Sequence, residues 1–439
     1  MKTRTHNRIP SGSPDSSPLA RGLRASAITL LSGAFLAVSA HSQSLSESLA
    51  SALDNYPKIR VLESRVQIEQ GKLDTERSNL RPQLSLSMRG GEESFGDSKG
   101  VQIYGETGNA SLQGRQLLFD GGNTKHRITE AQANLRTSEE SLRRVREEIA
   151  LELVTTYVNV IKYTRLVNLA QQSVYLHEDA LDKIEEKFEA GAGPKADVIL
   201  VKARLAMAEA TLESRRRQLN TASNSFLKLT GEYPQQLIEP EFPIWALPES
   251  IDEVTFESNP NIRAAHSELQ ATYSRRKVAE SQFRPQLNFV LEGDAAQSDR
   301  YEHVQEDAMA LITLSYSIFD GGRRRSEVRR ANSQIDEADW QLKNTLIETE
   351  TSFANAWEDL SSTEERIHLL RTHRDAMEAV VEAYNEQFEL GKRPLINLLD
   401  VENELSSARA SVEEERLNRL QAAYRLLSAM GTLTSSVNQ

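Results

Sequence analysis

The chain has 439 residues, with 52 Lys and Arg against 64 Asp and Glu, a net charge of −12. Because phosphate binding needs a basic face, this acidic balance argues against nucleic acid as a partner. The absence of cysteine excludes a disulfide scaffold, a thiolate metal site and a lipid attached to a cysteine. Low aromatic content (6%) with 26% charged residues suggests long solvated helices rather than one thick globular core.

Residues 1–40 have the features of a secretory signal peptide. A basic start precedes a mostly apolar stretch at 25–38, and the small residues at 38–40 form a cleavage site. The apolar stretch is too short for a membrane anchor, and no later stretch reaches a spanning length. We therefore expect an exported mature chain without a transmembrane helix.

The first part of the mature chain predicts a helix, two strands and two further helices. Residues 45–80 have a helical pattern that ends before Pro82. Residues 83–91 alternate, with Leu84, Leu86 and Met88 on one face, and residues 109–119 form a second candidate strand. Residues 121–189 carry apolar side chains at spacings of three and four, which is typical of a long packed helix. Residues 197–231 predict the last helix.

The same order of elements returns about 200 residues later. Arg-Pro-Gln-Leu at 81–84 recurs at 284–287, and Phe-Asp-Gly-Gly at 119–122 recurs at 319–322. The second set comprises helices at 251–283, 321–389 and 397–430 and strands at 286–293 and 311–319. A period this long indicates a duplicated half rather than a solenoid. The predicted organisation is a first repeat at 41–231, a Pro-rich linker at 232–250, a second repeat at 251–431 and a tail at 432–439.

The helix lengths predict how the elements pack. Each long helix matches two short helices placed end to end, so every apolar stripe is covered when the two short helices lie beside the long one. A long helix would extend on the order of 100 Å. Four strands cannot close a membrane barrel, because the smallest such barrels need about eight. We therefore predict a mainly α chain with a small β part, in which several copies contribute strands to one shared transmembrane β-barrel.

The duplicated order of helix, Arg-Pro-x-Leu, hairpin, Phe-Asp-Gly-Gly, long helix, Gly-containing tip and final helix resembles the TolC family of outer-membrane efflux proteins. The resemblance covers the mature chain nearly end to end. It implies a homotrimer with a twelve-strand barrel in the outer-membrane lipid bilayer and a periplasmic tunnel of antiparallel coiled-coil helices. It also implies a passive exit duct that meets a periplasmic adaptor protein and receives substrates from an inner-membrane transporter, for efflux or type I secretion.

Two Asp-Gly-Gly sequences mark the predicted strand-to-helix junctions. An aspartate suits a helix N-cap, and glycine permits the turn from strand to helix. We interpret these residues as structural rather than ligand-binding. They are Asp120, Gly121 and Gly122 in the first repeat, and Asp320, Gly321 and Gly322 in the second.

The helix tips remote from the strands form the second candidate site. Gly191 and Gly391 allow the chain to reverse, and Pro194 and Pro394 can start the next helix. The resemblance implies that an adaptor contacts these tips, and it adds Arg393 as a further contact candidate.

The same resemblance implies that the periplasmic entrance narrows at the tips through polar contacts and acidic rings. The matching candidates are Asn397, Asp400 and the first-repeat counterpart Asp197. Asn397 stands where the family often has an aspartate, which predicts a neutral polar ring at that level.

No cofactor or enzymatic site is predicted. His368 and His373 are five residues apart and lie on different helix faces, and no nucleophile motif, phosphate loop or acid pair stands out. His177 lies on the apolar stripe and is expected to be packed, while Trp245 is expected to anchor the linker. The alternatives are a periplasmic coiled-coil adaptor, which usually has one hairpin per chain, and a hydrolytic envelope enzyme, which would need a convergent polar pocket.

Overall fold

The structure, a computed structural model, describes residues 42–437 apart from 97–99, 101 and 300–302. The predicted signal peptide at 1–40 lies outside the described residues. The first set of elements is α1 (Leu45–Asn55), α2 (Pro57–Ser78), β1 (Gln83–Gly96), β2 (Gln102–Phe119), α3 (Asn123–Glu189) and α4 (Lys195–Thr230). The second set is α5 (Pro260–Ser281), β3 (Gln286–Ser298), β4 (Gln305–Ser315), α6 (Arg323–Glu389), α7 (Leu395–Met430) and α8 (Leu433–Val437).

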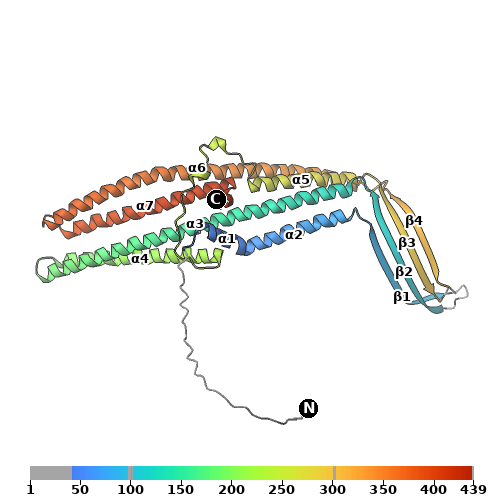
Figure 1. Ribbon diagram of the computed structural model, residues 1–439, viewed down its shortest axis with the longest axis horizontal. Coiled ribbons are helices and arrows are strands. Elements are labelled where there is room, and N and C mark those ends of the chain that lie inside the picture. Colours follow the sequence, from blue (N-terminus) through green and yellow to red (C-terminus); the bar gives the residue numbers. More distant parts are fainter. Residues whose placement is uncertain (1–41, 97–99, 101, 300–302, 438–439) are drawn as a thin grey trace, which may run out of the picture. The chain divides into compact units, whose positions relative to one another are not determined.

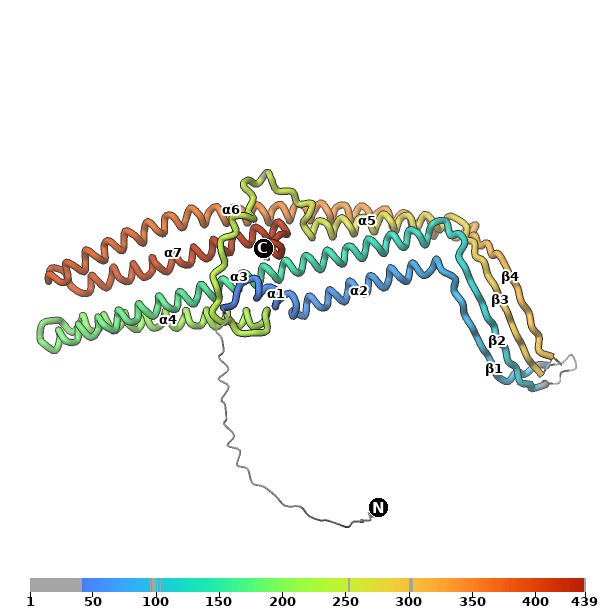
Figure 2. The backbone as a smooth tube through the Cα atoms, in the orientation of Figure 1, coloured from blue at the N-terminus to red at the C-terminus, as the bar shows by residue number. Residues whose placement is uncertain are grey.

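The two long helices, α3 and α6, have 67 residues each. Helix α3 lies beside α2 and α4, and α6 lies beside α5 and α7 (Figure 1). The predicted packing of one long helix against two short ones is therefore confirmed. Helix α3 also packs against α5 and α7, which belong to the second set, so the two sets share one helical body (Figure 2).

Two of the short helices differ from the prediction, one by an interruption and one by a later start. The helix expected at 45–80 is interrupted at Tyr56, because Pro57 cannot donate a backbone hydrogen bond and instead starts α2 at its first position. The helix expected at 251–283 begins at Pro260 as α5, where the Asn259 side chain accepts a hydrogen bond from the Asn261 N–H. Residues 251–253 form a short 3₁₀ turn.

The four strands form one antiparallel sheet in the order β1-β2-β3-β4. The strands β1, β2 and β3 are longer than predicted because the hairpins continue past the alternating segments. Strand β4 ends at Ser315 rather than at residue 319. Ser315 pairs with Gln286, and the next residue of β3 would be Pro285, which has no N–H for the ladder.

The largest buried cluster surrounds the middle of α3. Tyr157 is fully buried there, with its ring centre 6.2 Å from that of Phe226 on α4. Leu49 of α1 and Leu417 and Tyr424 of α7 belong to the same cluster. Helix α7 of the second set therefore shares this core with the first set, whereas α6 packs against α7 in a separate cluster that includes Phe353 and Leu426.

The linker between the two sets packs on this core. Leu237, Phe242 and Leu247 lie against the buried cluster, and Leu237 forms an isolated parallel bridge with Gln43. Trp245 is 56% exposed, so the expectation that it anchors the linker was wrong. Its apolar neighbours provide the contacts instead.

Candidate functional site

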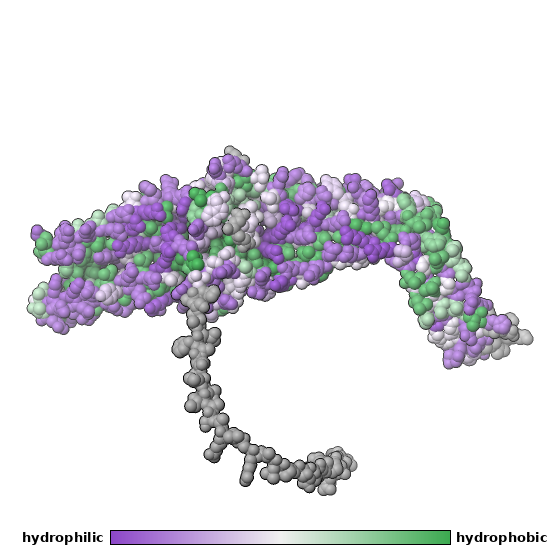
Figure 3. Space-filling view, in the orientation of Figure 1, coloured by the Kyte–Doolittle hydropathy of each residue, from purple (hydrophilic) through white to green (hydrophobic). Residues whose placement is uncertain are grey.

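The sheet separates apolar and polar side chains onto two faces. On one face Leu86 pairs with Leu112 and Phe289 with Ile312. Leu86 and Ile312 are 62% and 68% exposed, and hydrophobic residues gather on the part of the sheet nearest the helices (Figure 3). An exposed apolar sheet face is the surface that a lipid-facing wall requires.

The opposite face carries hydrogen-bonded polar side chains. The Ser87 and Ser111 hydroxyls lie 2.6 Å apart on β1 and β2, and the Gln113 amide donates to Glu292 Oε1 of β3 at 2.5 Å. Leu117, Val290, Met309 and Leu311 are apolar exceptions on this face. The alternation therefore has the sense expected of a wall between lipid and water.

The sheet has two open edges. Within the described residues β1 pairs only with β2, and β4 pairs only with β3. In hydrocarbon every backbone N–H and C=O must be hydrogen-bonded, so an open-edged sheet is not a stable membrane structure by itself. These edges need partner strands from outside the chain.

At the first junction Gly122 is the N-cap residue of α3, and Asp120, expected at that position, lies two residues earlier and binds the first turn from there. Its carboxylate accepts hydrogen bonds from the Gly122 and Thr124 N–H groups at 3.0 and 2.7 Å. Gly121 has a φ of +69°, and a Cβ there would lie 2.5 Å from the Arg284 Cβ. Glycine is thus required both by the backbone conformation and by the close approach of the segment before β3.

At the second junction Asp320 has the same position before α6. It accepts from the Gly322 and Arg324 N–H groups, each at 3.1 Å, and from the Arg324 guanidinium at 2.8 Å. The backbone hydrogen bond from Arg324 is the main reason that the pKa of Asp320 lies below its usual value. Gly321 and Gly322 have φ values of +66° and +90°.

Each tip reverses the chain through a glycine and a proline. Gly191 and Gly391 have φ values of +73° and +68°, and Pro194 and Pro394 are the N-cap residues of α4 and α7. These helices therefore begin two residues earlier than predicted. Arg393 lies over the Tyr384 ring, 3.6 Å from its centre, and donates to Gln387 Oε1 at 2.8 Å.

The three constriction candidates lie in the first two turns of α4 and α7. Asp197 and Asn397 are half-buried, and their N–H groups donate to the carbonyls of Pro194 and Pro394. Asp400 is one turn further along α7 and is exposed. The structure thus brings Asn397 and Asp400 together on one helix and places Asp197 on the other.

Asp400 has a partner that the sequence did not indicate. Its Oδ1 atom lies 2.5 Å from Nη1 of Arg204 on α4. A second ion pair joins the same helices at 2.9 Å, between Arg215 of α4 and Glu414 of α7. Between the two pairs lies a groove of about 690 Å³, lined by α3, α4 and α7. The two ion pairs therefore connect the helix hairpin α3–α4 with the hairpin α6–α7.

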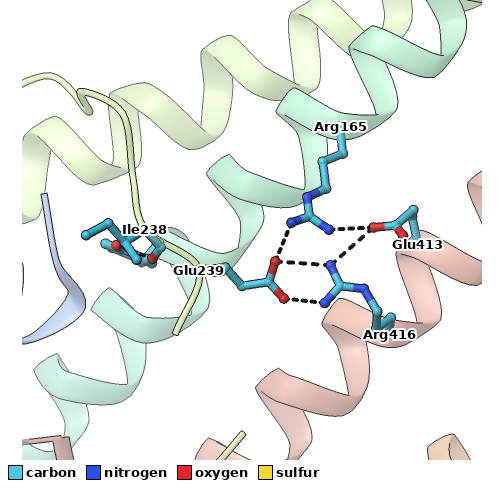
Figure 4. A network of polar contacts seen from close by, with 6 residues as sticks. Arg165, Ile238, Glu239, Glu413 and Arg416 are labelled. Atoms are coloured by element: carbon cyan, nitrogen blue, oxygen red, sulfur yellow. Dashed lines mark hydrogen bonds and ion pairs between the residues drawn. The ribbon is translucent and has the colours of Figure 1, made fainter. Parts of the chain in front are cut away.

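A four-residue ion-pair network holds the linker between the two hairpins (Figure 4). Glu239 of the linker binds both Arg165 of α3 and Arg416 of α7. Glu413 of α7 accepts from the same arginines at 2.8 and 3.2 Å. Burial disfavours ionisation of Glu413, but the hydrogen bonds from Arg165 and Arg416 outweigh it and lower its pKa. Sequence reasoning missed this network, because a Pro-rich linker carries no periodicity that points at a partner.

His177 is 2% exposed, which agrees with the expected packed position. In the part of the chain that the structure describes, no cluster of His, Asp and Glu could hold a metal ion. Over the same residues no helix combines the length and apolar character needed to cross a membrane.

A two-faced sheet with open edges, continued by long paired helices, defines the class of outer-membrane export channel subunits. Known proteins agree with this class. The family model described as outer membrane efflux protein matches residues 49–232 and 254–432. The chain therefore belongs to the outer membrane efflux protein family, whose members are channel components of the outer membrane.

Individual relatives are distant in sequence but similar over most of their length. Outer membrane efflux protein BepC of Brucella suis is 23% identical over 420 residues, covering 93% of this chain and 90% of its own. Alkaline protease secretion protein AprF of Pseudomonas aeruginosa is 22% identical, with coverages of 92% and 89%.

Solved structures show the same fold. The Campylobacter jejuni CmeC outer membrane channel has a TM-score of 0.79 at 17% identity, covering 89% of this chain and 86% of that one. The open state of the Neisseria gonorrhoeae MtrE outer membrane channel has a TM-score of 0.76 at 18% identity, with coverages of 90% and 90%. The predicted fold class, outer-membrane location and channel function are confirmed, and the family match favours the channel over the adaptor alternative.

Proposed function

We propose that three copies of this chain close one twelve-strand barrel and one helical tunnel, and that this trimer is the exit duct of a tripartite export system. The observation that carries the proposal is the two-faced sheet with open edges at β1 and β4. When β4 of one copy pairs with β1 of the next, the backbone N–H and C=O groups of both open edges become hydrogen-bonded. Repeating this head-to-tail contact around an axis gives a closed ring.

The helices support the same ring. Helix α2 exposes Val61 and Ile68, and α6 exposes Trp340 and Ile347, at 58–68% of their surfaces. Helix α2 packs against α3, whereas α6 packs against α5 and α7, so these apolar residues lie on separate flanks (Figure 1). Burying one flank against the other in a neighbouring copy removes both from water.

The duct would receive its substrate from an inner-membrane transporter through a periplasmic adaptor. Relatives named for efflux and for alkaline protease secretion both resemble this chain over most of its length, so the proposal extends to either pump type. The adaptor contacts would lie at the tips, at Gly191, Pro194, Gly391, Arg393 and Pro394. Pro194 and Pro394 fix the backbone φ where the next helix starts, and Arg393 is held against Tyr384, so the tips present a partly preformed surface.

The proposal is tested first at the lipid-facing side of the sheet. Phe289→Arg places a charge on the apolar face, and we expect a loss of about 2–4 kcal/mol in barrel stability near the bilayer midplane. Thr313→Arg is the matched control, since Thr313 lies on the polar face of the neighbouring strand. Folding into lipid vesicles, followed by urea titration, compares the two. Equal losses in both variants would show that the apolar face does not contact lipid.

The second test concerns the periplasmic constriction, where we place Asn397, Asp400 and Asp197. The ion pair with Arg204 compensates the charge of each Asp400 carboxylate. Arg204→Gln should therefore leave a ring of carboxylates and raise cation preference in planar-bilayer conductance. Asp400→Asn should leave a ring of Arg204 guanidinium groups and shift the ion preference of the channel toward anions. Either ring of charges acts on ions that pass within a Debye length of about 8 Å. Unchanged selectivity in both variants would remove Asp400 from the pore lining.

A further inference from the structure

Basic side chains concentrate where the four strands meet the helices. The segments 76–81, 120–130, 275–284 and 320–330 contain 13 Lys and Arg against six Asp and Glu, although the whole chain has a net charge of −12. They comprise the ends of α2 and α5 and the beginnings of α3 and α6. The junction is thus a positive zone in an acidic protein.

The acidic residues of this zone are already engaged. Asp120 and Asp320 bind the first turns of the two long helices. The four glutamates form ion pairs with zone arginines, namely Glu76 with Arg127, Glu130 with Arg275, Glu280 with Arg276 and Glu327 with Arg323. In the part of the chain that the structure describes, five exposed basic residues of the zone have neither an ion pair nor a side-chain hydrogen bond. They are Arg81, Lys125, Lys277, Arg325 and Arg330.

Stability of the fold does not explain these residues. Helix α6 begins with Arg323, Arg324 and Arg325, and its first turn has no acidic residue. The beginning of a helix carries the positive end of its dipole, so cations there are unfavourable. Arg324 is accounted for by Asp320, whereas Arg325 has no such compensation and Arg329 donates only to Ser326 Oγ at 2.8 Å. Their placement calls for an anion from outside the chain.

The surroundings of His126 report the same positive potential. Its pKa is lowered first by burial and then by the charges of Lys277, Lys125 and Arg284. These three residues come from α5, α3 and the segment before β3. Basic groups that are distant in sequence therefore converge at one level of the structure.

The position of the basic zone, next to the apolar part of the sheet, indicates which kind of anion it binds. Ile318 and Phe319 lie between β4 and α6 and are each 87% exposed, so the apolar surface continues from the sheet to the first arginines. At the far end of the strands the described residues include the acidic Glu92, Glu106 and Asp307 instead. An apolar band followed at the helical side by aromatic and then basic side chains is the sequence of groups that meets a lipid leaflet and its headgroups.

We propose that the exposed basic side chains of the junction form a belt that binds the phosphate groups of anionic glycerophospholipids in the leaflet next to the helices. The belt rests on the sheet lying in the membrane, as proposed above. Long Lys and Arg side chains can reach toward the headgroup layer while their stems stay on the apolar surface. Each basic group near an anionic surface contributes about 1 kcal/mol.

The test uses the purified oligomer in nanodiscs of phosphatidylethanolamine with or without phosphatidylglycerol. The variant combines Arg325→Gln, Arg329→Gln and Arg330→Gln, and native mass spectrometry counts retained lipid. The control combines Arg136→Gln, Arg217→Gln and Arg371→Gln, three exposed arginines of α3, α4 and α6 outside the zone. Three groups at about 1 kcal/mol each predict a loss of phosphatidylglycerol affinity on the order of a hundredfold in the variant. The control should match the parent.

A second variant, Lys125→Gln with Lys277→Gln, repeats the test on α3 and α5 if the first assembles poorly. Equal phosphatidylglycerol retention in parent and variants would overturn the proposal. So would displacement of the lipid by inorganic phosphate at equal concentration, which would identify a free-phosphate site. Loss of the oligomer with unchanged lipid retention would also overturn it, because the arginines would then bind a neighbouring copy. If Phe289→Arg and Thr313→Arg reduce barrel stability equally, the sheet does not lie in the membrane as proposed, and the belt loses its basis for that separate reason.

Discussion

Helices α3 and α6 have the same length and follow the same Phe-Asp-Gly-Gly sequence, yet they have different environments. Helix α3 buries 20 residues and α6 buries eight. Helix α3 is surrounded by α2, α4, α5 and α7, whereas α6 contacts α5 and α7. One long helix therefore lies in the interior of the chain and the other on its flank.

Positions related by 200 residues show how the difference is encoded. Tyr157 is fully buried, and its counterpart Trp357 is partly buried. Glu140 is 6% exposed and pairs with Arg263 of α5 at 2.9 Å, while its counterpart Trp340 is 68% exposed. A buried, paired charge on α3 thus corresponds to an uncovered aromatic residue on α6. In the proposed assembly a neighbouring copy would cover this apolar flank of α6.

The largest expected effect is on the interior helix. Tyr157→Ala removes a fully buried ring and both hydrogen bonds from its hydroxyl, to the Gln43 and Ile238 carbonyls at 2.7 and 2.6 Å. We expect a loss of about 3–5 kcal/mol in unfolding free energy, measured by guanidinium titration at fixed protein concentration. Trp357→Ala should cost less, because the tryptophan ring is only partly covered. An equal or larger cost for Trp357→Ala would mean that the interior and flank assignments are reversed.

The second prediction concerns the flank. Trp340→Ala should leave the fold of a single chain unchanged, since the ring is mostly exposed, but weaken assembly. A central interface tryptophan typically contributes about 2 kcal/mol or more, which corresponds to roughly thirtyfold in dissociation constant. Light scattering in detergent over a dilution series measures this change. Tyr175→Ala on α3 is the matched control, because Tyr175 is 69% exposed. Identical dissociation of both variants would contradict a role for the α6 flank in assembly.

The sequence was sufficient for the kinds of element and their order. Period-two alternation at 83–91 and heptad-like spacing in 121–189 predicted β1 and α3, because side-chain spacing directly reflects strand and helix geometry. The breaks at Pro57 and Pro260 were available from the same reasoning, since proline favours the first position of a helix. Strand ends were less accurate, because the hairpins continue through polar residues that do not alternate.

Long-range partners could not be obtained in this way. The pairs Arg204–Asp400 and Arg165–Glu413 join residues that are far apart in the sequence, and each depends on the rotation of two helices about their axes. Periodicity places a residue on a face of its own helix but does not determine which residue faces it. The difference between α3 and α6 was partly readable, since Glu140 and Glu147 in α3 correspond to Trp340 and Ile347 in α6. The reason for this difference lies in the tertiary structure, because α5 covers α3.

The smallest expected effect separates the polar contacts of the two long helices. On the α3 side Glu413 binds Arg165 and Arg416, and its pKa is lowered because these hydrogen bonds outweigh its burial. A carboxyl group whose folded-state pKa is lowered stabilises the protein above its unfolded pKa, and this contribution is lost as the pH falls through the folded value. On the α6 side Glu364 pairs with Arg419 at 2.7 Å and is more exposed than Glu413. Glu413→Gln should therefore reduce the unfolding free energy by up to about 1 kcal/mol at pH 7. The difference in unfolding free energy between Glu413→Gln and the parent should shrink below the usual glutamate pKa of about 4.5, whereas Glu364→Gln should have little effect at either pH.

Urea titrations of the three proteins at pH 7 and under acid conditions provide the comparison. A Glu413→Gln difference that stays constant into acid would show that the Glu413 charge does not bind the linker network to α3.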